Sequence, residues 1–166
     1  MTAPTDVTAL PVCAKAELEL TELQREVLLQ EVPAFAATLR DPSSRERYLG
    51  LAEAVASGTV PPLMIFSLEA MLELLLQTRR VRQYHGIEAE QALTELFYRT
   101  GRGAGLREAA REVNTALTAL RGQTFERVTV TSGPGRHTIL IETDRARLSL
   151  KIDGAGAEVD KIEVGG

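Results

Sequence analysis

Hydrophobic residues are most continuous between positions 61 and 86. Pro61 and Pro62 are expected to end any preceding element, because proline fixes φ and lacks an N–H group. Ser67 is a suitable N-cap, so the pattern predicts a helix over 68–84 that ends at Gly86. Its polar residues fall on one narrow stripe, and apolar residues cover most of the remaining circumference. Such a helix is packed on several sides, as in the core of a helical bundle or a helix shared with a partner subunit.

Helical spacing of apolar residues also marks the regions before and after this run. Thr21 and Gln24 form a capping-box pattern, which predicts a helix from about Glu22 that Pro33 should kink or divide. A second capping box at 43–46 predicts another helix to about residue 57. Two further amphipathic segments predict helices over 87–99 and 106–121.

After Gln123 the hydrophobic period changes from that of a helix to that of a strand. Four alternating segments are separated by the turn sequences 132–135, 143–146 and 153–156. Short links favour antiparallel pairing, because parallel strands need long crossovers. The sheet would have one apolar face, which the helices are expected to cover. The sequence therefore predicts an α+β protein, with a bundle of about five helices followed by a four-stranded antiparallel β-meander. Its alternating apolar residues are Val128, Val130, Ile139, Ile141, Leu148, Leu150, Ile152, Ile162 and Val164.

These patterns divide the chain into three regions. Residues 1–13 lack periodicity and are expected to form a loose leader, 14–122 form the helical region, and 123–166 form the meander packed on it. Residues 15–20 alternate like a strand but are also good helix formers, so both interpretations stay open. A chain of 166 residues is expected to form one domain or two small ones in contact.

Composition narrows the functional classes. The formal net charge of −4 argues against a molecule that binds nucleic acid through its overall charge. The single cysteine, Cys13, excludes an internal disulfide framework and a cysteine-rich zinc site, and no cofactor is indicated. Glutamates interrupt the central run, which is shorter than the roughly 20 residues of a membrane-spanning helix. Without a signal-peptide pattern, the expected location is cytoplasmic.

The sharpest basic cluster contains Arg79, Arg80 and Arg82 beside Tyr84. These residues could contact phosphates or nucleic acid, with Tyr84 available for stacking. The alternative, which we favour, is that the cations stabilise the negative end of the predicted helix.

Residues 100–105 (TGRGAG) predict a break before a helix N-terminus. Free N–H groups there could hold an anion, assisted by Arg102 and Arg107. The segment lacks the lysine and hydroxyl residue that end a nucleotide phosphate loop, which favours a plain connection.

The order helix, break, helix and hairpin over 87–142 resembles a winged helix-turn-helix in outline only. Arg107 and Arg111 lie where a recognition helix would present residues to DNA. A six-residue break is longer than usual for that motif, and Glu108 and Glu112 dilute the positive charge. An ordinary solvated helix face is the favoured interpretation.

Glu69, Glu73 and His137 are candidates for a ligand pocket. Paired carboxylates can bind a metal or divide acid and base roles. Neither histidine follows a glutamate at the spacing of helical carboxylate metal sites, so no metal site is expected. No nucleophile motif accompanies His137, so no catalytic residue is assigned and a non-enzyme is favoured.

Three functions follow from these observations. The favoured one is a non-catalytic, bacterial-type protein-interaction or structural module that binds a protein partner or itself, because a small bundle leaves part of the central helix uncovered. One alternative is a nucleic-acid-binding regulator. The other is a small-molecule-binding or catalytic pocket between the helices and the sheet.

Overall fold

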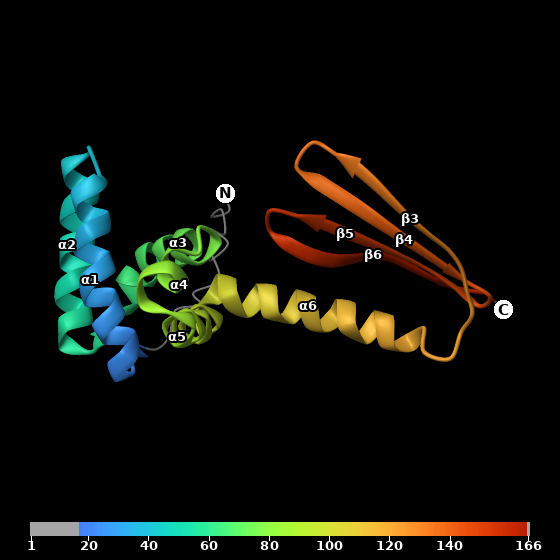
Figure 1. Cartoon of the computed structure of the whole chain (residues 1–166), viewed down its shortest axis with the longest axis horizontal. Coiled ribbons are helices and arrows are strands. Elements are labelled where there is room, and N and C mark those ends of the chain that lie inside the picture. The colour runs from blue at the N-terminus through green and yellow to red at the C-terminus, as the bar shows by residue number, and fades with distance from the viewer. Residues whose placement is uncertain (1–16, 166) are drawn as a thin grey trace, which may run out of the picture. The chain divides into compact units, whose positions relative to one another are not determined.

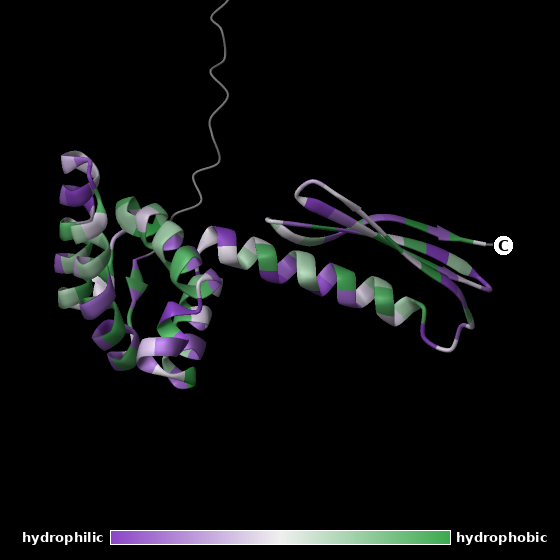
Figure 2. Cartoon of the chain, turned by 45° about the horizontal axis from the view of Figure 1, so that its top comes forward, coloured by the Kyte–Doolittle hydropathy of each residue, from purple (hydrophilic) through white to green (hydrophobic). Residues whose placement is uncertain are grey.

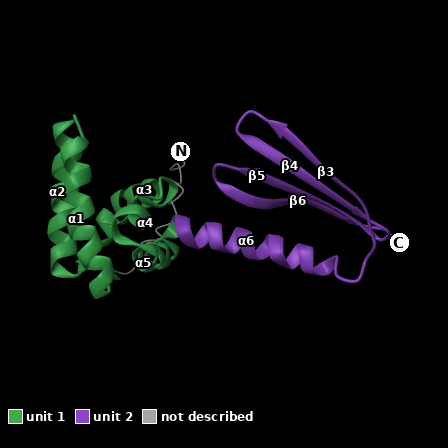
Figure 3. Ribbon diagram, in the orientation of Figure 1, with its two compact units in different colours: residues 1–101 green, residues 102–166 purple. Residues whose placement is uncertain are grey.

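The chain forms two compact units, which the computed structural model describes over residues 17–165 (Figure 3). Unit 1 extends to Gly101 and is helical, whereas unit 2 begins at Arg102 and combines a helix with a four-stranded antiparallel sheet. The expected α+β class, with helices first and a β-meander last, is confirmed. The expected leader at 1–13, including Cys13, lies outside the described residues.

Unit 1 begins with a small strand and a helical hairpin. Strand β1 (Leu18–Glu19) pairs antiparallel with β2 (Thr59–Val60), so the strand interpretation is confirmed at these two residues. Helices α1 (Glu22–Thr38) and α2 (Pro42–Ser57) lie side by side (Figure 1). Helices α3 (Pro62–Gln77), α4 (Arg80–His85) and α5 (Ile87–Tyr98) complete the unit.

Helix α1 is continuous through Pro33. The predicted capping box is confirmed, because Thr21 Oγ1 accepts from the Gln24 N–H and Gln24 Oε1 accepts from the Thr21 N–H. The prediction that Pro33 would divide the helix is wrong. Pro33 faces solvent, while Val32 and Ala36 on either side of it are buried. Packing of this apolar face holds the helix together despite the hydrogen bond that proline removes.

The start of α2 differs from the expected capping box at 43–46. Its N-cap is Asp41, which accepts hydrogen bonds from Ser43 Oγ at 2.6 Å and from the Ser44 N–H at 2.8 Å. Pro42 occupies the first turn, where its missing N–H needs no partner. The hydrogen bonds from Ser43 and then Ser44 lower the pKa of the Asp41 carboxyl to about 2.

The expected central helix over 68–84 is two helices. Helix α3 begins at Pro62, and Ser67 is a buried residue within it rather than its N-cap. Proline is common in the first turn of a helix, which explains the earlier start. Helix α3 ends at Gln77, and Arg79 adopts a left-handed conformation with φ of 54° before α4. The expected core position is confirmed, because one side of α3 is buried: Leu68, Met71, Leu72 and Leu75.

Unit 2 contains the longest helix. Helix α6 (Gly101–Ala119) includes most of residues 100–105, so the predicted break there is wrong. Each glycine lowers helix stability by only about 1 kcal/mol, which a helix of 19 residues tolerates. Helix α6 shares a core with the sheet, and the boundary between the two compact units lies between Gly101 and Arg102.

The sheet is a β-meander in which each strand pairs with the next. Strands β3 (Phe125–Gly133), β4 (Arg136–Thr143), β5 (Ala146–Asp153) and β6 (Gly156–Val164) follow that order in space. Hydrophobic and hydrophilic residues are interspersed along α6 and along the strands (Figure 2). The buried core joins α6 to the inner face of the sheet through Val113, Leu120, Ile141, Ala146, Leu148 and Leu150.

Candidate protein-interaction surface

The solvent side of α3 carries an apolar stripe, which consists of Leu63, Phe66, Ala70 and Leu74. Their spacing of three and four residues places them on one face of the helix. Leu63 is 96% exposed, Phe66 75% and Leu74 45%. The opposite side of α3 is the buried core of the unit. Helix α3 is therefore apolar on two sides, and unit 1 covers only one of them.

A groove adjoins the C-terminal end of this stripe. It has a volume of about 470 Å³ and lies between α1, α3 and α4. Leu74 belongs to both the stripe and the groove, so the two apolar surfaces are continuous. The other apolar lining residues are Ala34, Phe35, Leu75 and the ring of Tyr84.

An ionic cluster around the buried Glu31 carboxylate forms one wall of the groove. Glu31 of α1 is only 4% exposed and accepts a hydrogen bond from Arg80 Nε at 2.7 Å. His85 Nε2 lies 2.8 Å from the other carboxylate oxygen, which places the proton on Nε2 because a carboxylate only accepts. The Arg80 guanidinium also lies 4.7 Å from the centre of the Tyr84 ring. These contacts attach α4 to α1 and orient Tyr84 at the groove.

The pKa of Glu31 reflects two opposed effects. Burial by itself would raise the pKa, but the hydrogen bonds from Arg80 and His85 outweigh burial and hold it below the usual value of 4.5. Ionisation of Glu31 therefore stabilises the folded protein above the pKa of the unfolded chain. This contribution is lost as the pH falls through the lower pKa of the folded protein.

Glu31→Gln is expected to weaken the acid dependence of stability, because glutamine cannot ionise in either state. The free energy of unfolding should be measured by urea denaturation between about pH 7 and pH 3. The wild-type protein should lose stability more steeply than the variant below about pH 4.5. Parallel curves for the two proteins would contradict the stabilising role of the Glu31 carboxylate.

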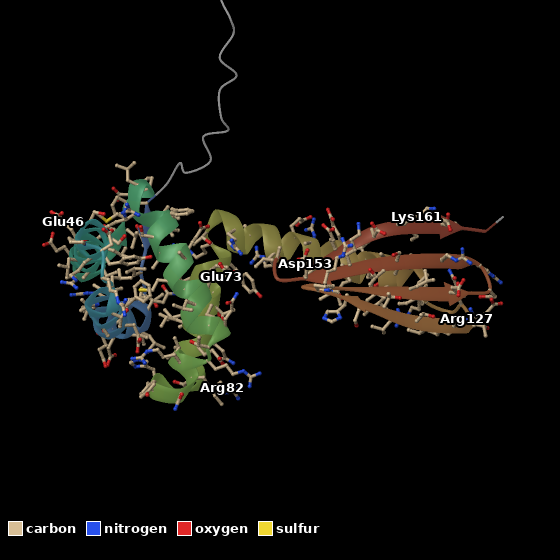
Figure 4. All side chains as sticks on the ribbon, turned by 90° about the horizontal axis from the view of Figure 1, so that it is seen from above. Glu46, Glu73, Arg82, Arg127, Asp153 and Lys161 are labelled. Carbon is tan, nitrogen blue, oxygen red and sulfur yellow. The ribbon has the colours of Figure 1, made fainter. Side chains whose placement is uncertain are left out.

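The three arginines of the predicted basic cluster have separate surroundings. Arg79 is the exposed left-handed residue between α3 and α4, and Arg80 pairs with Glu31. Arg82 Nη1 lies 3.7 Å from Glu90 Oε2 of α5, and Figure 4 labels it on α4. Two of the three cations thus face carboxylates on different helices, which reduces the field available to a phosphate. Phosphate binding by this cluster stays a prediction.

The other predicted cationic residues, Arg102, Arg107 and Arg111, all lie on α6. The connection predicted over 100–105 is mostly helical, because Gly101 already begins the helix, and anion binding at this helix start stays a prediction. Arg111 Nη2 pairs with Glu108 Oε1 at 2.9 Å on the exposed face. An ion pair of this type is typical of a solvated helix face. Nucleic-acid binding by these residues stays a prediction.

The residues of the predicted pocket belong to different units. Glu69 and Glu73 lie on α3, where Glu73 accepts a hydrogen bond from Gln77 at 3.1 Å. His137 lies on β4, is exposed, and has Nδ1 2.9 Å from Ser132 Oγ. The ligand-pocket assignment therefore stays a prediction.

Within residues 17–165, histidine, cysteine and acidic side chains form no group able to hold a metal ion. Over the same range, every helix is too short or too polar to cross a membrane.

Comparisons with protein families, curated proteins and solved structures gave no match to this chain. The functional interpretation of the stripe on α3 therefore depends on the geometry of the stripe alone. Sequence reasoning missed Leu63 and Phe66 because it began the helix after them. The signal that could have found them is Pro62, since proline is common in the first turn of a helix.

Proposed function

We propose that this chain is a non-catalytic protein-interaction module that self-associates through α3. The observation that carries the proposal is the exposure of Leu63 and Phe66, at 96% and 75%, on a helix whose other side is the core. A contiguous exposed apolar surface costs free energy in water and is typical of a site that a protein partner covers.

A second copy fits this surface because α3 is self-complementary. Its protruding residues, Leu63 and Phe66, lie near one end, and the groove at Leu74 lies near the other. Eleven residues separate Leu63 from Leu74, which is about 16 Å along a helix. An antiparallel pair of α3 helices would bring Leu63 of each copy to the groove of the other.

The same arrangement matches side-chain sizes. A twofold axis crossing α3 near residue 68 places Phe66 opposite Ala70 of the partner subunit, and Ala70 opposite the partner's Phe66. A large residue facing a small one allows close packing of two helices. The four residues of the stripe are uncharged, so their contact brings no like charges face to face.

Sedimentation velocity of the full chain tests the proposal. The wild-type protein should associate through α3 to a degree that rises with concentration, and Leu63→Glu/Phe66→Glu should lose this α3-mediated association. Both residues are exposed, so the circular dichroism spectrum should be unchanged. We expect the dissociation constant to rise at least about a hundredfold, because the dimer would bury two charges per copy without partners.

The matched control is Leu49→Glu on α2, where the leucine is 49% exposed and outside the stripe. It should dimerise like the wild type. A wild-type monomer at every concentration, or association of the double variant that equals that of the wild type, would refute the proposal. Ala70→Phe tests the geometry, because two large side chains would then meet across the twofold axis and weaken the dimer.

The nucleic-acid and pocket alternatives stay predictions. The carboxylate partners of Arg80, Arg82 and Arg111 do not favour phosphate binding, and His137 is in a different unit from Glu69 and Glu73.

A further inference from the structure

The two edges of the sheet in unit 2 are unlike each other. The β6 edge carries Glu158, Asp160, Lys161 and Glu163, and its pairing with β5 shifts register beside Ser149. Charged residues and irregular pairing are common protections against addition of another strand. The β3 edge is uncharged over 128–133 (VTVTSG) and pairs regularly with β4 there. In Figure 4, labelled Arg127 and Lys161 mark the β3 and β6 sides of the sheet.

Helix α6 covers the inner face of the sheet but not its β3 edge. The core that α6 forms uses residues of β4, β5 and β6, and none of the described residues of β3. Phe125, Val128 and Val130 are 61%, 58% and 61% exposed. Val128 is directly opposite Ile141, which belongs to that core, so both residues share the inner face. The apolar face therefore continues onto β3 beyond the cover of α6.

The uncovered side of α6 continues this surface. Leu117 is 39% exposed and lines a groove of about 520 Å³ with Phe125. The groove also includes Asn114 and Arg121, so its rim is polar. The inner-face residues of a strand added beside β3 would lie next to Val128 and Val130. The added strand would also have exposed backbone groups of β3 to pair with, because β3 is at the end of the strand order.

We propose that β3 pairs antiparallel with β3 of a second copy, so that the two sheets join at this edge. The pairing is symmetric about Thr129, which lies opposite Thr129 of the partner subunit. Val128 then lies opposite the partner's Val130, and Arg127 lies opposite the partner's Thr131. Val–Val and Thr–Thr pairs are favourable cross-strand neighbours.

Charge favours a second β3 over the other edge of the sheet. Arg127 Nε lies 3.9 Å from Glu142 of its own sheet, and in the symmetric register it faces a threonine rather than another arginine. Pairing with β6 of another copy would instead set its four charged residues beside a strand that is uncharged over 128–133. The proposal concerns unit 2 alone and does not depend on association through α3.

Site-specific cross-linking tests the register. In a Cys13→Ser background of the full chain, Thr129→Cys should form a disulfide-linked dimer on mild oxidation. Directly opposite Cβ atoms of an antiparallel pair are about 4.5–5.5 Å apart, close to the range that a disulfide spans. Thr131→Cys is the matched control, because both threonines are exposed on β3. The two introduced thiols would be four residues apart in the register, or about 13 Å, and should link poorly. Equal linking at both positions would overturn the proposal.

Amide hydrogen exchange supplies an independent test without a covalent link. Exchange over 125–133 should slow as wild-type concentration rises, because pairing protects outward backbone N–H groups. Val130→Lys should abolish this dependence, since an edge lysine opposes pairing. Val164→Lys is the control on β6, where the valine is 77% exposed. This variant should retain the concentration dependence of exchange over 125–133.

The Leu63→Glu/Phe66→Glu variant separates the two surfaces. Protection of β3 should persist in this variant, because α3 does not take part in strand pairing. Protection that disappears with the α3 substitutions, or exchange that never depends on concentration in the wild type, would overturn the proposal.

Discussion

Leu72→Ala is expected to lower the free energy of unfolding of unit 1 by about 2–5 kcal/mol. Leu72 is fully buried on α3. Truncation removes favourable transfer of apolar atoms from water and also leaves a cavity that a close-packed core fills only in part. The change should be measured by urea denaturation followed by far-ultraviolet circular dichroism. The Leu63→Glu/Phe66→Glu background should be used, because dissociation at α3 would otherwise contribute to the apparent stability of unit 1.

Leu74→Ala is the matched control for this prediction. It makes the same chemical change on the same helix, but Leu74 is 45% exposed. Its cost should be within about 1 kcal/mol, because the residue already faces solvent on the stripe. Equal losses for the two variants would mean that the two sides of α3 are not buried as differently as the structure shows.

Gly156→Ala is expected to lower the free energy of unfolding of unit 2 by about 2–4 kcal/mol. Gly156 has a φ of +128°, a conformation that residues with a side chain rarely adopt. An added Cβ would also lie 2.8 Å from Leu106 Cδ2 of α6. The backbone strain and the displaced leucine both act against the contact between the helix and the sheet. Thermal unfolding should show the loss as a lower melting temperature.

Gly154→Ala is the control, since Gly154 is in the turn between β5 and β6 and Gly156 begins β6 two residues later. A Cβ at residue 154 would meet nothing within 4 Å. Its effect should be within about 1 kcal/mol. If Gly154→Ala were as costly as Gly156→Ala, the loss would come from turn flexibility and not from the positive φ of Gly156 and its contact with Leu106.

The four strands of the sheet and their antiparallel order could be predicted from sequence. Alternation of apolar residues is a strong signal, and the turn residues between segments leave few possible registers. Val128 and Val130 therefore pair with Ile141 and Ile139 as an adjacent hairpin requires. The exposure of β3 could not be predicted. Alternation of apolar residues shows which face of a strand is apolar, but how many strands a single helix covers depends on packing.

The helical unit was harder to predict at its boundaries and contacts. Proline can end one element or begin the next, so the start at Pro62 is ambiguous in the sequence. The hydrogen bonds of Glu31 to Arg80 and His85 connect residues 49 and 54 positions apart. No short-range pattern marks such pairs. Helix α3 is apolar around most of its circumference, so its period could not show which side unit 1 covers.

The β-meander connects only strands that are neighbours in the chain. Each hairpin closes a short loop, and the entropy lost in closing a loop grows with its length. The search that slows many β proteins, in which distant segments must meet, is therefore largely absent from this sheet. Strand pairing in unit 2 should form early and quickly. Docking of the amphipathic α6, which must find a face assembled from several strands, is then the slower step of its folding.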